Sequence, residues 1–198
     1  MINTIQVLLQ GEKWNLQRCG NRILLFEENP INYPEDYIQI ENEAGKFIVS
    51  EVHRDIKQIK AKTEKEEEAG IYATVVYKRL FDNLIDRTKV NNIRISLEAG
   101  GEEKKVLDSI TNDFDDSVFS IDSEDNLKIS LIHSGNKVSI KFGGEYLVED
   151  VSLSRGYVAL YNYCTKLRHI SLFYNEMRKK LDCTINRQII VKMYILGK

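Results

Sequence analysis

Cysteine is scarce in this 198-residue sequence, which has only Cys19, Cys164 and Cys183, with no CxxC spacing among them. An odd, widely spaced set argues against a disulfide framework and against the ligand pattern of a structural zinc site. We therefore expect reduced thiols in a cytoplasmic protein. Proline is scarcer still, because Pro30 and Pro34 are the only two and both lie in "NPINYP". We expect an irregular loop there.

An excess of positive charge is also absent, since 28 Lys and Arg residues face 30 Asp and Glu residues without a basic cluster. Nucleic-acid binding normally needs a basic face, so we do not expect a nucleic-acid partner. The longest apolar runs are far shorter than the roughly 20 residues of a membrane span. The first residues do not resemble a signal peptide. We expect a cytoplasmic protein that does not associate with membranes.

What the sequence does contain is typical of a folded domain, with 42% hydrophobic and 29% charged residues. Alternating apolar residues predict hairpins that turn through Gly20-Asn21, "NEAG" and Ser134-Gly135-Asn136. Two segments, 62–87 and 154–182, have apolar residues at helical spacing. These patterns predict an α+β fold with antiparallel sheet(s) and two long amphipathic helices.

Four shorter segments have less decisive patterns. Residues 1–10 indicate a short helix, although their alternation also fits a strand. In residues 88–117, "NIRISL" could be a strand, "EAGGEE" a loop and "KKVLDSITNDF" a short helix. Thr63 and Glu66 have the spacing of a capping box at the head of the first long helix. Residues 186–196, which include "RQIIVKMYIL", predict a closing strand.

The order of hairpin, extra strand and helix occurs twice. Gly20-Asn21 corresponds to Gly135-Asn136, residues 45–52 to 144–151, and Gly70 to Gly156. We interpret the chain as a single domain, 1–198, with an internal pseudo-repeat of 12–87 and 118–182. The alternative is that two hairpins share glycine turns through turn chemistry alone.

A catalytic site is not expected. His53 in "EVHRD" has Asp55 on its own face of a strand end, but no nucleophile lies nearby, and a solvated cluster explains it as well. His133 and His169 lack metal-ligand spacing. The acidic runs "NDFDDS" and "DSEDN" do not have the ligand alternation of a calcium loop. We therefore expect no enzyme activity, no cofactor and no metal.

A binding surface is the remaining interpretation. Tyr33 lies in the proline loop, and acidic residues, among them Glu35 and Asp36, flank it. Tyrosine supplies contact area at low entropic cost, and an acidic rim attracts basic partners. The alternative is that the tyrosine simply packs on the sheet.

The layout resembles small cytosolic immunity proteins of bacterial polymorphic-toxin systems. The resemblance lies in "WNLQRCGNRILLF", "YIQIENEAGKFIVSEVHRD", "YATVVYKRLFDNLIDR" and "GYVALYNYCTKLRHISLFYNEMR". It implies a protein that binds and occludes a cognate toxin domain, one set of such proteins countering NAD-cleaving (NAD glycohydrolase) toxins. A loop that fills the toxin's cleft would lie in 28–36 or 99–103. The toxin-binding candidates are Tyr33, Glu35, Asp36, Gly100 and Gly101.

Two other classes of function stay open. A chaperone or adaptor for a secreted or phage-encoded protein would present a similar surface without a cofactor. An enzyme centred on His53 and Asp55 would need a concave pocket around those side chains. The position of the gene beside a toxin gene separates an inhibitor from a chaperone.

Overall fold

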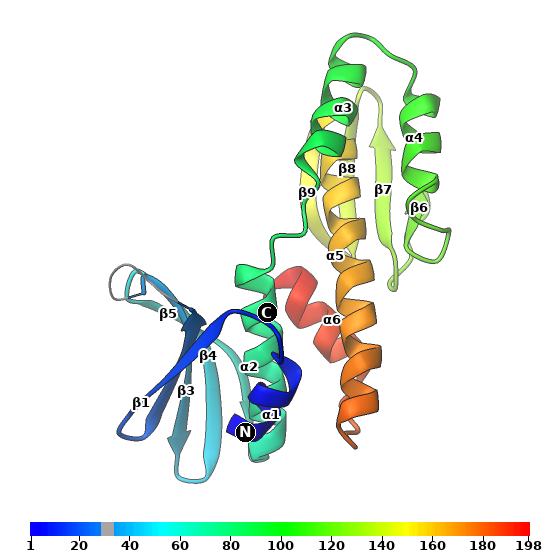
Figure 1. Cartoon of the computed structure of the whole chain (residues 1–198). Coiled ribbons are helices and arrows are strands. Elements are labelled where there is room, and N and C mark those ends of the chain that lie inside the picture. The colour runs from blue at the N-terminus through cyan, green and yellow to red at the C-terminus, as the bar shows by residue number, and fades with distance from the viewer. Residues whose placement is uncertain (29–33) are drawn as a thin grey trace. The chain divides into compact units, whose positions relative to one another are not determined.

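A five-stranded sheet and a four-stranded sheet, each with its own helices, make up the structure (Figure 1). This computed structural model describes residues 1–28 and 34–198. The chain divides into two compact units, where the sequence suggested a single domain. The first unit combines Met1–Asp82 with Leu172–Lys198, and the second is Asn83–Ser171. The predicted α+β class is confirmed.

The sheet of the first unit is antiparallel throughout and follows chain order, β1-β2-β3-β4-β5. Its strands are β1 (Trp14–Cys19), β2 (Arg22–Glu27), β3 (Asp36–Glu43), β4 (Lys46–His53) and β5 (Ile56–Thr63). The predicted turns at Gly20-Asn21 and in "NEAG" join β1 to β2 and β3 to β4, which confirms both hairpins. Each strand therefore pairs with its neighbour in sequence, and β1 and β5 are the edges.

Three whole helices belong to this unit, α1 (Ile2–Leu8), α2 (Glu66–Phe81) and α6 (Arg187–Leu196), together with the end of α5 (Leu153–Lys180) from Leu172 on. Helix α2 packs on β2 to β5 and also contacts α1 and α6. The sheet side chains beneath it include Ile38, Ile40 and Val49, which are completely buried. At the rim of this core Glu51 of β4 accepts a hydrogen bond from Arg79 of α2 at 2.7 Å. The core thus holds the sheet in place as a rigid support for its loops.

Two predictions about this unit are wrong. The segment 186–196 is a helix, not a closing strand: the Asn186 side chain accepts from the backbone N–H of Gln188, and Gly197 ends the helix at φ 71°. The capping box is also absent, because α2 has Lys65 as its N-cap. Thr63 instead ends β5 and donates to Glu68 at 2.7 Å.

The second unit begins with α3 (Arg87–Glu98) and α4 (Glu103–Thr111). Its strands are β6 (Phe119–Ile121), β7 (Ile129–Ser134), β8 (Lys137–Phe142) and β9 (Glu145–Ser152), in the order β6-β7-β8-β9. The pair β6–β7 is parallel and the other two are antiparallel, so the predicted antiparallel pattern fails at that one pair. The "NIRISL" segment lies in helix α3 instead of a strand.

Helix α5 (Leu153–Lys180) supplies its residues up to Ser171 to this unit and confirms the second long helix. Figure 1 shows it running along the four-stranded sheet. Gly156 makes this approach possible, because a Cβ there would lie 1.9 Å from Cγ2 of Val138 on β8. Leu160 of α5 and Leu131 and Ile140 of the sheet are fully buried. They form the core of the second unit.

The two halves of the predicted pseudo-repeat differ in topology. Strand β8 pairs directly with β9, whereas β2 pairs with β3 and β4 lies one strand further away. The strand formed by residues 144–151 is therefore adjacent to the preceding hairpin in its sheet, whereas the strand formed by residues 45–52 is separated from the β1–β2 hairpin by β3. What they share is the turn before the strand, in which Gly45 and Gly144 have φ of 84° and 83°. Duplication of the whole unit stays a prediction.

Candidate functional site

The most organised exposed cluster of the first unit lies where β4 turns into β5. We call it the β4–β5 corner, and it consists of Glu35, Asp36, His53, Arg54, Asp55 and Ile56. The register of the β3–β4 hairpin places Asp36 opposite His53, and Nδ1 of His53 contacts the Asp36 carboxylate. Arg54 bonds Glu35 twice, through its backbone N–H to the carbonyl at 2.9 Å and through Nε to the carboxylate at 3.0 Å. These contacts hold the two acidic residues that follow the proline loop, Glu35 and Asp36, against the end of β4.

The turn that builds this corner is strained. Arg54 and Asp55 connect β4 to β5 and have φ of 46° and 65°. A two-residue hairpin with positive φ at both positions normally contains Asn, Asp or Gly. An arginine held in this region costs on the order of 1 kcal/mol. Strain of this kind gathers at functional positions, where the surrounding structure maintains it.

Ile56 lies in the same cross-strand row as Asp36 and His53, with its side chain 64% exposed. Beside the turn, a hollow of about 270 Å³ is lined by Pro34, Glu35, Arg54 and Asp55. A large exposed aliphatic side chain within a ring of polar groups is the arrangement found at protein interfaces. The corner therefore combines an apolar contact point with a charged rim.

The structure brings together some of the residues that the sequence singled out. Glu35 and Asp36 lie in the β4–β5 corner, together with His53 and Asp55. The carboxylate that contacts His53 is that of Asp36, whereas the sequence pointed to Asp55, which the turn carries out of the strand. Tyr33 lies outside the described residues. Ile56 was missed, although its place after a charged turn at the head of an edge strand was a usable signal.

Gly100 and Gly101 lie in the second unit and end helix α3. The N–H of Gly101 bonds the Ser96 carbonyl at 2.8 Å and that of Gly100 bonds the Leu97 carbonyl at 3.2 Å, which is a Schellman cap. Gly100 has φ of 75°, and a Cβ on Gly101 would lie 2.5 Å from the Ser96 oxygen. Both residues are exposed. Helix capping alone is enough to require glycine at both positions.

A second polar cluster, which the sequence did not indicate, surrounds His133 of β7. Its Nδ1 lies 2.9 Å from a carboxylate oxygen of Asp122, and its Nε2 lies 2.6 Å from Glu103 of α4. The hydroxyl of Tyr157 on α5 donates to the same Glu103 oxygen at 2.6 Å. Because both ring nitrogens face carboxylates, the contacts are satisfied when both nitrogens carry a proton. The cluster therefore favours the imidazolium form.

The contacts within this cluster shift the pKa values of His133, Asp122 and Tyr157. Burial alone would lower the pKa of His133, but the hydrogen bonds with Asp122 and Glu103 outweigh it and hold the pKa above its ordinary value. The backbone N–H of His133 donates to Asp122 and lowers the pKa of that carboxyl. Burial, and then the bond to Glu103, raises the pKa of Tyr157. Tyr157 therefore keeps its proton and acts as a donor.

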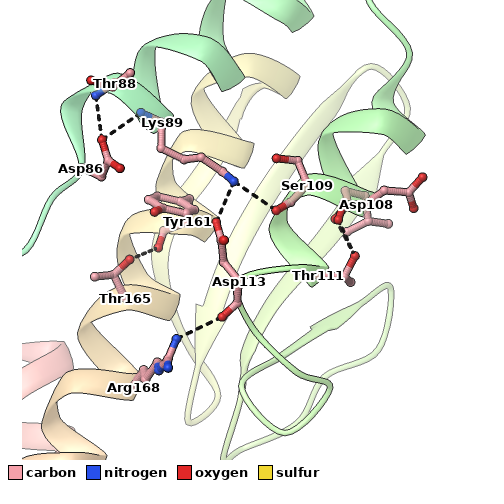
Figure 2. A network of polar contacts seen from close by, with 11 residues as sticks. Asp86, Thr88, Lys89, Asp108, Ser109, Thr111, Asp113, Tyr161, Thr165 and Arg168 are labelled. Atoms are coloured by element: carbon pink, nitrogen blue, oxygen red, sulfur yellow. Dashed lines mark hydrogen bonds and ion pairs between the residues drawn. The ribbon is translucent and has the colours of Figure 1, made fainter.

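A third network holds the helices of the second unit together (Figure 2). Lys89 of α3 contacts the Asp113 carboxylate at 2.7 Å, and Arg168 of α5 donates to the backbone carbonyl of Asp113 at 3.1 Å. Asp86 caps α3 by accepting from the backbone N–H groups of Thr88 and Lys89. These contacts join α3 and α5 to the residues after α4, and a structural role accounts for them.

Within residues 1–28 and 34–198, no group of three or more His, Cys, Asp or Glu side chains is placed to hold a metal ion. In that same part of the chain, no helix has both the length and the apolar character to cross a membrane. No protein-family model, curated protein or solved structure matches this chain.

Proposed function

We propose that this protein is an inhibitor that binds a partner protein through the β4–β5 corner. The observation that carries the proposal is Ile56, a largely exposed aliphatic side chain in one row with His53 and Asp36. Interfaces concentrate their binding free energy in a few apolar anchors surrounded by polar residues that exclude water. The strained Arg54-Asp55 turn supports the same assignment, because its geometry places charged groups at the edge of that anchor.

The class of partner follows from the resemblance noted in the sequence. An immunity protein of a polymorphic-toxin system binds a toxin domain in the producing cell and covers its active cleft. The corner holds three carboxylates, those of Glu35, Asp36 and Asp55, against the side chains of Arg54 and His53, and this acidic balance favours a partner surface that is basic around an apolar pocket. We expect this partner to be a toxin domain, with an NAD glycohydrolase as the expected chemistry.

The proposal is tested by co-purification of the tagged protein from its native host, identification of the bound protein by mass, and a binding measurement with that protein. Replacement of Ile56 by Asp should weaken the complex tenfold or more, because a charge would replace the apolar anchor. The toxin's activity should be inhibited by the wild-type protein and less so by this variant.

Ile59 provides a matched control. It lies on the same strand with 53% exposure, but it pairs with Ser50 and therefore points to the opposite face from Ile56. Ile59→Asp should leave the affinity within about twofold, since it is far from the proposed contact. Equal effects of the two variants would exclude the corner as the binding surface. A bound protein that is a secreted client instead of a toxin would overturn the inhibitor assignment in favour of a chaperone.

A further inference from the structure

Within the described residues, the two sheets have four edge strands, and three of these discourage pairing with another chain. Strand β5 contains Lys57, Lys60 and Lys62 and has a bulge in its pairing with β4. Strand β9 pairs irregularly with β8 and holds Asp150 at φ 49°. Strand β6 has only three residues. Lysine side chains, bulges and short length are all features by which natural sheets protect their edges.

Strand β1, the fourth edge, has none of these features. Its sequence, WNLQRC, contains no lysine and no proline, and its six residues pair in unbroken register with β2. Four of the six residues are exposed. A regular, accessible edge of this kind is a template for pairing with one more strand.

The hairpin geometry determines which backbone groups of β1 point away from β2. A two-residue turn joins the strands, so Cys19 and Arg22 form a hydrogen-bonded pair. Every second residue of β1 then bonds to β2, and the residues between them direct their N–H and C=O groups outward. The residues with outward groups are Trp14, Leu16 and Arg18.

The Asn15 side chain supports this assignment. Its Oδ1 accepts a hydrogen bond from the backbone N–H of Leu16 at 2.7 Å, as expected if that N–H points away from β2. Among the described residues, none donates a hydrogen bond to the outward carbonyl of Leu16. Because Asn15 is exposed, its amide can turn away when another strand offers a carbonyl, and one hydrogen bond then replaces another at small net cost.

A second copy of β1 fits this edge in an antiparallel register centred on Leu16. Leu16 then lies opposite Leu16 of the second copy, and Trp14 lies opposite Arg18. All the outward groups of one copy meet outward groups of the other, so each of these pairs can exchange two hydrogen bonds. On the opposite face of the strand, Asn15 lies opposite Gln17, which pairs two polar side chains in contact with water.

The side chains on the first of these faces are complementary. The Arg18 guanidinium would lie beside the Trp14 ring of the second copy, which is the most favourable aromatic partner for a cation. The two Leu16 side chains would cover each other next to Leu25, which pairs with Leu16 and is completely buried. The two copies of Arg18 would stay roughly 14 Å apart along the strands. The β5 edge would instead bring lysines of two copies together.

We infer that two copies of this protein associate through β1 into a symmetric dimer in which their five-stranded sheets become continuous. A strand pair of this length forms a small interface, so the dimer is weak and dissociates on dilution. The symmetry closes both β1 edges and prevents open-ended assembly. Strand β1 is the edge opposite β5, so the contact does not use the β4–β5 corner and the inference does not rest on the function proposed above.

Sedimentation of the full-length protein over a wide concentration range tests for the dimer. Trp14 is the only tryptophan, so a change in its fluorescence over the same range reports on this edge. Leu16→Lys should weaken the dimer tenfold or more, because two like charges would meet at the symmetry axis. Ile59→Lys is the matched control, since it places lysine at a 53% exposed isoleucine on the other edge strand and should change the dissociation constant less than twofold.

Disulfide cross-linking tests the register and detects a weak dimer. In a Cys19→Ser background, Leu16→Cys places two thiols at a bonded antiparallel pair, whose Cα atoms are about 5.5 Å apart and within disulfide range. Gln17→Cys lies opposite Asn15, and its two Cα atoms would be roughly 8 Å apart, which is too far. We expect at least fivefold more cross-linked dimer from Leu16→Cys.

Three results would overturn the inference. The first is a protein that stays monomeric at every concentration and gives no cross-linked dimer with Leu16→Cys. The second is an equal effect of Leu16→Lys and Ile59→Lys on the dissociation constant, which would place the contact elsewhere. The third is an equal yield of cross-linked dimer from Leu16→Cys and Gln17→Cys, which would exclude the proposed register.

Discussion

At the scale of single residues, His133 is the group whose charge the fold most clearly controls. It bridges Glu103 of α4 and Asp122, the residue after β6, and its backbone N–H donates to Asp122 as well. Tyr157 completes the set by donating to Glu103. The positive ring therefore compensates two carboxylates that would otherwise repel each other beside a buried tyrosine.

His133→Gln should make stability less dependent on pH. The folded pKa of His133 lies above its unfolded value, so its contribution is fully present below the unfolded pKa and is lost as pH rises through the folded pKa. We expect the variant to lose about 1–2 kcal/mol of unfolding free energy at pH 6 and clearly less at pH 9. Urea unfolding of both proteins at the two pH values measures this difference. A larger loss at pH 9 than at pH 6 would contradict the assignment.

The corner shows how far sequence can predict a site. The "NEAG" turn was predicted, and counting outward from it pairs Asp36 with His53, so this contact was within reach. The His133 cluster could not be predicted from the sequence, because its members come from α4, β7 and α5 and from the residue after β6. Their meeting depends on which strands and helices are neighbours, and no local spacing encodes that.

At the scale of elements, the close packing of α5 against the four-stranded sheet depends on Gly156. If no neighbouring atom were close to this position, Gly156→Ala would stabilise the helix by about 1 kcal/mol through its higher helix propensity. We expect a net loss of about 1–3 kcal/mol instead, because the new methyl group would overlap Val138. Chemical denaturation measures the change.

The control for this effect is a double-mutant cycle. Val138→Ala removes the methyl group that lies nearest, so the two substitutions together should be less harmful than their sum by about 1 kcal/mol or more. Additive effects, or a Gly156→Ala variant more stable than the wild type, would show that α5 does not depend on this close approach.

Helix α6 shows why one element was predicted wrongly. Its buried residues are nearly consecutive: Ile190, Val191, Met193, Tyr194 and Ile195. A helix that is buried on most sides has no 3.6-residue pattern, and a short run of this kind cannot be distinguished from a strand by periodicity. The end signals did distinguish it, because Asn186 and Gly197 are typical cap residues. The hairpins and helix α5, whose buried residues recur at helical spacing, were predicted correctly; α2 was predicted correctly too, although it is buried continuously from Ala69 to Lys78.

At the scale of the whole molecule, the two units have separate cores. A local defect in one core should therefore lower protection against hydrogen exchange mainly within that unit. Gly156→Ala, which strains the second unit, should speed exchange of buried amides in residues 83–171 and leave α2 and the first sheet close to wild type. Exchange measured by NMR or mass spectrometry tests this, and equal acceleration in both units would show that they unfold as one.

The division of the chain also orders events during its synthesis. The second unit is continuous, so the ribosome has synthesised all of it before α6 is complete. The first unit is discontinuous, and its α2 contacts α6, which is translated more than a hundred residues later. The nascent chain must therefore keep part of the α2 surface uncovered until the whole inserted unit has been synthesised, which makes that surface a natural point of attachment for a ribosome-associated chaperone.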